Sequence, residues 1–266
     1  MNKSEKNRIL FQFAQKYLEE NLPEGLNNAD LEKYYEPIQF KDMGDVYEQF
    51  IMSAQNAGMK PNVIKFNNEH PNEKKYIKDK LLSFCGTNSY DLDKIAILIP
   101  EELYELFSKE LGVTGKIWQG WCKSVVEAAM YLRQFPDADS FRNFIRSKDI
   151  DCKKRSDIPN QIAKNIYGMG FALVCDALKE MGFISFSKPD VHIKRIFTEL
   201  GICGDDDEAV FNALDELAKD NNVSPYKADK IFWLICSGYF YKDPNIRGKH
   251  PHADGFIANA KDKLCW

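Results

Sequence analysis

Apolar residues recur every three or four positions along almost the whole chain, and this spacing restricts the folds open to it. Residues Lys3–Glu20 show the pattern first, with Ile9, Phe13 and Tyr17 on one side. The same spacing returns in residues 43–58, 100–112, 120–135, 139–148, 160–167, 205–221 and 224–240. No run alternates apolar and polar residues over the length of a strand. The sequence therefore predicts an all-α protein of about ten helices.

Length and composition are those of an ordinary globular protein. The 266 residues suffice for one large domain or two small ones, and 44% of them are hydrophobic and 29% charged. No apolar run is long enough to cross a bilayer, and residues 1–17 form a charged amphipathic stretch rather than a signal peptide. A cytoplasmic protein is expected. The net charge of -4 argues against a surface that is basic throughout, but it permits a local positive face.

The cysteines give no sign of a metal centre. They are scattered, with no C-x-x-C pair and no histidine partners at metal-ligand spacing. Neither a metal nor another cofactor is expected, and an odd number of thiols in a cytoplasmic protein favours the reduced form. The seven are Cys85, Cys122, Cys152, Cys175, Cys203, Cys236 and Cys265.

Residues 166–197, IYGMGFALVCDALKEMGFISFSKPDVHIKRIF, interrupt one helical pattern and resume another. Gly168 can adopt the left-handed conformation that ends a helix, and Gly170 lets its main chain approach a ligand closely. The helix that follows would point its free amides out of the turn, which suits a phosphate group. The alternative is an ordinary tight turn between two core helices, because Gly-x-Gly alone is a weak signal.

Asp190 opens the next helical pattern directly after Pro189. An aspartate at this position is a good helix N-cap, accepting amides of the first turn. The same position would also fix a carboxylate for chemistry, so capping and catalysis are compatible.

The combination of Gly168-Met169-Gly170, a helix and then the segment PDVHI resembles the helix–hairpin–helix superfamily of DNA glycosylases, nearest to its 8-oxoguanine branch. The resemblance implies that Asp190 is the catalytic carboxylate and that the three turn residues grip the DNA backbone by main-chain amides. Residues 47–63, which contain Ser53-Ala54-Gln55, are similar to the segment that faces DNA in that family. Gln55 would fill the gap left by an extruded nucleotide.

One departure from the family pattern concerns the lysine nucleophile of its bifunctional members. That lysine stands two residues after the second glycine of the hairpin, where this chain has Ala172. An alanine cannot form a Schiff base, so the resemblance implies a monofunctional enzyme that leaves the strand intact. Lys164 and Lys188 are the nearest lysines in sequence.

The resemblance also implies a domain organisation, with two helical subdomains flanking a DNA-binding cleft. Residues 1–45 would be N-terminal helices packed with the C-terminal part. Residues 46–175 would form a barrel-like helical subdomain ending in the helix–hairpin–helix, and residues 176–266 would carry the catalytic aspartate. A glycosylase must take its target base out of the duplex, so a base pocket is needed. Candidates for its walls are Trp118, Phe232, Trp233 and His192, with Trp121 as a further aromatic residue.

Each pocket aromatic has core packing as its alternative, because helical proteins bury such residues routinely. His192 has an exposed surface position as its alternative. Basic residues crowd the sequence near the turn and could form a DNA-binding face, or an ordinary solvated surface. They are Lys148, Lys153, Lys154, Arg155, Lys188, Lys194 and Arg195.

The expected function is base excision repair: hydrolysis of the N-glycosidic bond of a damaged or mispaired base in double-stranded DNA, by a monomer without a cofactor or membrane partner. A nucleoid-associated position would follow in a prokaryote and a nuclear one in a eukaryote. The alternatives are a DNA-binding module that lacks turnover and a helical protein-interaction domain. The sequence does not indicate which base is excised.

Overall fold

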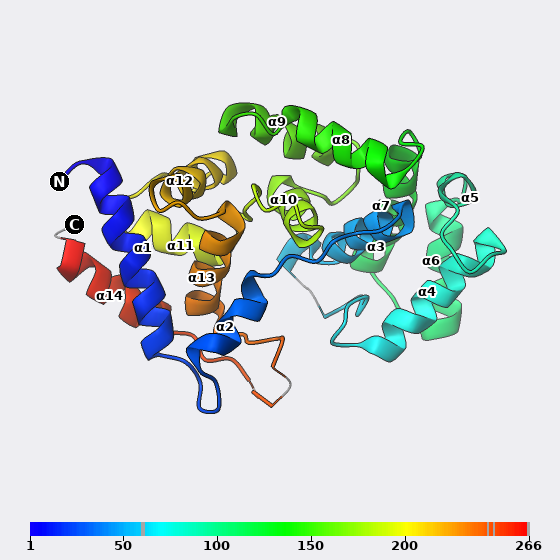
Figure 1. The fold of residues 1–266 in the computed structure, drawn as a ribbon. Helices are drawn as coiled ribbons and strands as arrows, with labels where there is room; N and C mark the ends of the chain where they lie inside the picture. Colours follow the sequence, from blue (N-terminus) through cyan, green and yellow to red (C-terminus); the bar gives the residue numbers. More distant parts are fainter. Residues whose placement is uncertain (60–61, 244, 247, 265–266) are drawn as a thin grey trace. The chain divides into compact units, whose positions relative to one another are not determined.

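The structure, a computed structural model, describes residues 1–59, 62–243, 245–246 and 248–264. Within these residues it is all-α, with fourteen α-helices, the 3-10 turn Ala57–Met59 and no strand (Figure 1). The all-α prediction is confirmed. None of these helices combines the length and the apolar character needed to span a bilayer. The chain divides into two compact units, unit 1 (residues 1–38 and 182–266) and unit 2 (residues 39–181).

Unit 1 is built around a helix that is buried on nearly all sides. This helix, α13 (Pro225–Ser237), packs against all the other helices of the unit. Those are α1 (Lys3–Glu20), α2 (Asn28–Tyr35), α11 (Val191–Glu199), α12 (Asp207–Asp220) and α14 (Ala253–Leu264). The predicted apolar side of residues 3–20 faces this core: Leu10 and Ala14 are fully buried in it, and Ile9, Phe13 and Tyr17 pack against it partly buried. Figure 1 shows the first and last helices, α1 and α14, side by side.

Unit 2 has α7 (Lys116–Leu132) at its centre, in contact with α3, α5 and α6. Helix α10 in turn packs against α3 and α9. The other helices of the unit are α3 (Met43–Ala54), α4 (Pro71–Cys85), α5 (Leu92–Ala96), α6 (Pro100–Leu111), α8 (Ala138–Lys148), α9 (Cys152–Ala163) and α10 (Phe171–Glu180). Because α10 packs within unit 2, the observed boundary falls after Met181, whereas the sequence placed it after Cys175. The other boundary falls after Ile38 instead of residue 45.

Helix α9 differs most from its predicted extent. The sequence predicts a helix over 160–167, but α9 covers Cys152–Ala163. The Asp151 side chain accepts a hydrogen bond from the Lys154 amide at 2.9 Å and so sets the early start. The helix then continues through Pro159, which costs stability in a helix interior. Pro159 is buried beside Ile158 and Ile162, and this packing offsets the cost.

Candidate functional site

The Gly168-Met169-Gly170 turn joins α9 to α10 inside unit 2. Gly168 has φ +73, in the region that favours glycine, and a Cβ there would lie 3.4 Å from Ser124 Oγ. Met169 is 3% exposed, and its side chain anchors the turn in the core. Gly170 is exposed, caps α10 with no side-chain bond, and has open space where a Cβ would be. The two glycines thus have different roles: the first permits the turn, and the second leaves the start of α10 uncovered.

Only some main-chain amides of the turn are available for a ligand. The Met169 N–H donates to the Ile166 carbonyl at 3.2 Å, so this amide is not free to grip a phosphate as expected. The Leu173 and Val174 amides both donate to the Gly170 carbonyl. The Gly170 and Ala172 N–H groups have no hydrogen-bond partner within the described part of the chain. These two amides and the positive end of the α10 dipole are the groups of the turn to which an anion could bind.

Helix α7 holds the turn in place through two polar side chains that the sequence did not single out. Ser124 Oγ donates to the Tyr167 carbonyl at 2.6 Å. The Tyr167 N–H donates to Glu127 Oε2 at 2.6 Å. The main-chain N–H and carbonyl of Tyr167, the residue before Gly168, are therefore both held by α7. Ser124 is buried at 1% exposure. A polar residue on an otherwise apolar helix face was the only sequence signal that could have indicated this role.

Asp190 is the N-cap of α11 in unit 1, as the sequence predicts. Its Oδ1 accepts the His192 amide at 3.0 Å and the Ile193 amide at 3.1 Å. The residue is half-buried, and Oδ2 has no hydrogen-bond partner among the residues that the structure describes. One oxygen is thus fixed by the helix while the other remains available to a ligand or a water molecule.

The loop before Asp190 is held by a buried carboxylate that the sequence analysis missed. Asp229, on α13, is fully buried and accepts a hydrogen bond from the main-chain N–H of Lys188. The Asp190 N–H donates to the Lys188 carbonyl at 2.8 Å, so Lys188 contacts the buried acid through its N–H and the cap residue through its carbonyl. An acid in the apolar pattern of α13 could have signalled this contact.

Cys236 reports on the charge of Asp190. The pKa of the Cys236 thiol is raised to about 11, mainly by burial; the Asp190 carboxylate also raises it, while the Arg195 guanidinium lowers it. A nearby negative charge disfavours the thiolate, so Asp190→Asn is expected to move the pH profile of Cys236 alkylation to lower pH, and Arg195→Gln to higher pH. Mass spectrometry of alkylated Cys236 between pH 8 and pH 11 measures both shifts. Profiles that coincide with that of the native protein would contradict this arrangement.

The aromatic residues proposed as walls of a base pocket lie mostly in the cores. Trp118 is 3% exposed and packs against Phe107 and Trp121 in unit 2. Phe232 is fully buried in unit 1. Neither ring offers a face for stacking, so the core alternative is correct for both. Only Trp233 remains partly exposed.

Trp233 and His192 belong to unit 1. Trp233 packs against Tyr241 with ring centroids 5.9 Å apart. The His192 side chain is half-buried, and its ring makes no hydrogen bond within the described residues. These two remain the candidates from the predicted set that a ligand could reach.

Gln55 does not point toward solvent. The residue is 2% exposed, its Nε2 donates to the Phe66 carbonyl at 2.7 Å, and its Oε1 accepts the Phe66 N–H at 2.9 Å. The side chain thus completes a main-chain pairing and, in this conformation, cannot fill a gap in a duplex. The expectation for Gln55 is corrected on this ground.

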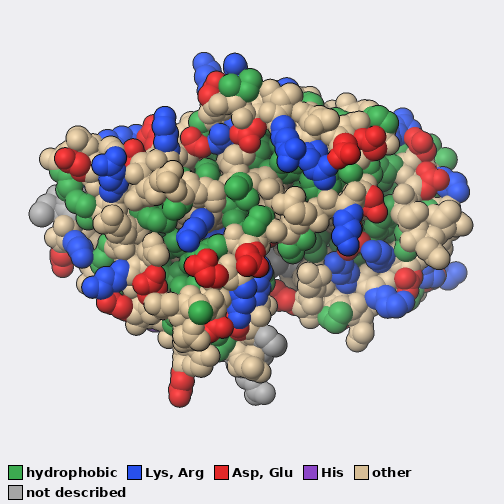
Figure 2. Space-filling model, viewed as in Figure 1, with side chains coloured by type: hydrophobic (Ala, Val, Ile, Leu, Met, Phe, Trp, Pro, Cys, Tyr) green, Lys and Arg blue, Asp and Glu red, His purple; other side chains and the backbone are tan. Residues whose placement is uncertain are grey.

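The basic residues near the turn are largely engaged with acidic partners. Lys154 lies 3.9 Å from Asp151, and Lys194 lies 2.5 Å from Asp207. Arg155 binds Asp149 at 2.5 Å, and Arg195 binds both Glu199 and Asp254. Figure 2 shows Lys and Arg side chains interspersed with Asp and Glu on the face in view. These ion pairs offset the positive charge of four of the seven residues proposed for a local DNA-binding face.

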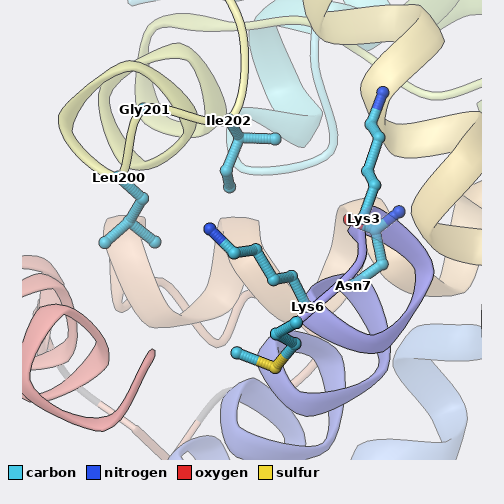
Figure 3. Close-up of a pocket in the computed structure, with 7 residues that line it drawn as sticks. Lys3, Lys6, Asn7, Leu200, Gly201 and Ile202 are labelled. Atoms are coloured by element: carbon cyan, nitrogen blue, oxygen red, sulfur yellow. The ribbon is translucent and has the colours of Figure 1, made fainter. Parts of the chain in front are cut away.

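A hollow of about 500 Å³ lies in unit 1, between the start of α1 and the end of α11. Figure 3 shows the Lys6 side chain extending toward Leu200 and Ile202 there. None of the predicted site residues lines this hollow, which Met1, Lys3, Asn7 and Gly201 complete. In the described parts of the chain, no group of three or more His, Cys, Asp or Glu residues could hold a metal ion.

Comparison with known proteins does not extend this description. No protein-family model matches the chain, and neither a curated protein nor a solved structure matches it.

Proposed function

We propose that the chain is a monofunctional DNA glycosylase of the helix–hairpin–helix type, which removes a damaged or mispaired base from double-stranded DNA in base excision repair. In this proposal the amides at the start of α10 bind a backbone phosphate, and Asp190 faces the sugar of a flipped-out nucleotide. The observation that carries the proposal is the half-exposed Asp190 carboxylate, with one oxygen fixed by α11 and the other unpartnered among the described residues.

The chemistry suits a carboxylate held in this way. Breaking the bond between C1′ and the base nitrogen leaves a positively charged, oxocarbenium-like sugar, while the bonding electrons depart with the base. An ionised Asp190 stabilises that charge. Its free oxygen can orient the attacking water, whose oxygen bonds to C1′ and whose proton passes to the carboxylate. The His192 and Ile193 amides hold the carboxylate in a fixed orientation.

The proposal predicts base loss without strand cleavage. Ala172 is the second helical residue of α10 and has no amine, so no Schiff base with C1′ can form there. We expect a panel of duplexes bearing uracil, 8-oxoguanine, hypoxanthine, alkylated purines and mismatches to contain a substrate. Strand breaks should appear only after hot alkali, scored on a denaturing gel. Breaks without alkali would contradict the monofunctional assignment, and no base loss from any duplex would contradict the glycosylase.

A DNA-binding module without turnover is the second candidate. The buried positions of Gln55, Trp118 and Phe232 favour it, because three residues expected to act on an extruded nucleotide are engaged in the cores. Salt-dependent binding of duplex DNA together with no base loss across the panel would identify this function. A chain that bound no DNA at all would exclude both candidates.

A further inference from the structure

Beside the Gly-Met-Gly turn, the exposed Lys123 of α7 lies against the exposed Tyr167. Lys123 Nζ is 4.6 Å from the centre of the Tyr167 ring, and its side chain is 48% exposed. Tyr167 is 50% exposed although it is a large aromatic residue. Both lie in unit 2: Lys123 is on α7, and Tyr167 directly precedes the turn that presents the Gly170 and Ala172 amides.

The position of the Tyr167 ring is set by its surroundings. Ser124 and Glu127 fix the main chain of the residue on both sides. The ring also packs over Gly120, where an added Cβ would lie 3.0 Å from Tyr167 Cε1. A side chain at position 120 would therefore displace the ring. The absence of a side chain at Gly120 thus lets the Tyr167 ring pack closely against α7 at the edge of the turn.

The ring and Glu127 together hold the Lys123 ammonium group. A cation over a tyrosine face is attracted by the ring quadrupole. Glu127 Oε1 is 3.7 Å from Lys123 Nζ, while Oε2 of the same carboxylate accepts the Tyr167 N–H. That carboxylate offsets part of the positive charge. Lys116, two turns earlier on the same face of α7, is exposed and adds a second cation.

We propose that Lys123, positioned by Tyr167, contacts a second phosphate of the nucleic-acid strand whose neighbouring phosphate binds the α10 amides. The inference rests on the proposed function and extends its DNA-binding surface along α7 toward Lys116. A single small anion would bind Lys123 only weakly, because the negative charge of Glu127 lies beside the ammonium group. A strand gains from several phosphate contacts at once and from the counterions that they release. The ring acts through the ammonium group, because Lys123 already covers the face on which a base would stack.

Binding of an undamaged, fluorescein-labelled duplex to the full chain at a series of salt concentrations tests this proposal. Lys123→Gln is expected to weaken binding and to lower the slope of log K against log salt by about 0.9, the loss of one phosphate contact. Lys75→Gln is the matched control, since Lys75 forms the same i, i+4 pair with Asp79 on α4. It should leave the slope unchanged. An unchanged slope for Lys123→Gln would overturn the proposal.

Tyr167 needs a test that separates positioning from direct contact. Tyr167→Phe keeps the ring and should bind as the native chain does, whereas Tyr167→Leu should weaken binding. Because the ring acts through Lys123, Tyr167→Leu should cost nothing further in a chain that already carries Lys123→Gln. Equal losses in both backgrounds would overturn the positioning role. Circular dichroism melting confirms that each variant is folded.

The outcomes separate this inference from the proposed function. Weakened binding by Lys123→Gln in a chain that releases no base supports the α7 contact and overturns the glycosylase. Base release by the native chain, together with an unchanged salt slope in Lys123→Gln, supports the glycosylase and overturns the α7 contact. Absence of DNA binding by the native chain overturns both.

Discussion

Asp190→Asn is expected to lower base release about 100- to 1,000-fold while the protein stays folded and still binds DNA. The loss follows from charge, because a neutral amide cannot stabilise the oxocarbenium-like sugar or accept a proton from water. The fold should tolerate the change, since asparagine caps a helix about as well as aspartate does. The amide oxygen can still accept the His192 and Ile193 amides that Oδ1 accepts now. Single-turnover base release, measured on the best duplex of the panel, gives the effect.

A second N-cap aspartate in unit 1 provides the control. Asp206 caps α12 and accepts the Ala209 amide at 2.8 Å, so Asp206→Asn makes the same chemical change in the same structural role. This variant should release the base at the native rate. If both variants lost activity equally, the effect of Asp190→Asn would be structural. Full activity in Asp190→Asn would remove Asp190 from the chemistry.

The helices were predictable because their signal is local. Spacing of apolar residues, an N-cap side chain and a closing glycine all lie within one helix, as in Ser224, Pro225 and Gly238 of α13. The start of α9 was missed because tertiary burial of Pro159 overrides the usual cost of proline in a helix. Packing of α10 on α3 and α9 likewise sets the unit boundary beyond the position chosen from the sequence.

The candidate site likewise combines local features that the sequence predicts with tertiary features that it does not. The Gly-Met-Gly turn and the capping role of Asp190 follow from short sequence patterns. Which side chains face solvent does not, because exposure depends on neighbours far along the chain. Gln55 is withdrawn from solvent by Phe66, and Phe232 by the core of unit 1. Glu127 and Asp229, which fix the two loops, were missed because each contacts a segment about 40 residues away, at Tyr167 and Lys188.

Gly238→Ala is expected to destabilise unit 1 by more than about 4 kcal/mol. Gly238 ends α13 with φ +60, and the segment that leads into α14 crosses directly over it. An added Cβ would lie 2.0 Å from the main-chain carbon of His250 and 2.3 Å from Pro251 N. Because these are backbone atoms, no rotamer change relieves the clash. The His250 N–H also donates to the Gly238 carbonyl at 2.9 Å. This hydrogen bond would break if residues 250–251 moved away from the end of α13.

Gly112→Ala separates the clash from the backbone strain. Gly112 ends α6 in the same left-handed conformation, with φ +66, but has nothing within 4 Å of the added Cβ. Its replacement should cost only about 1–2 kcal/mol, the strain of a left-handed alanine. Urea unfolding gives both values, and hydrogen exchange of α13 amides assigns the larger one to unit 1. Equal costs for the two variants would show that residues 250–251 do not lie against the end of α13. Helix α13 also carries Asp229, which holds the loop before Asp190. Gly238→Ala should therefore lower the rate of base release as well as the stability of unit 1.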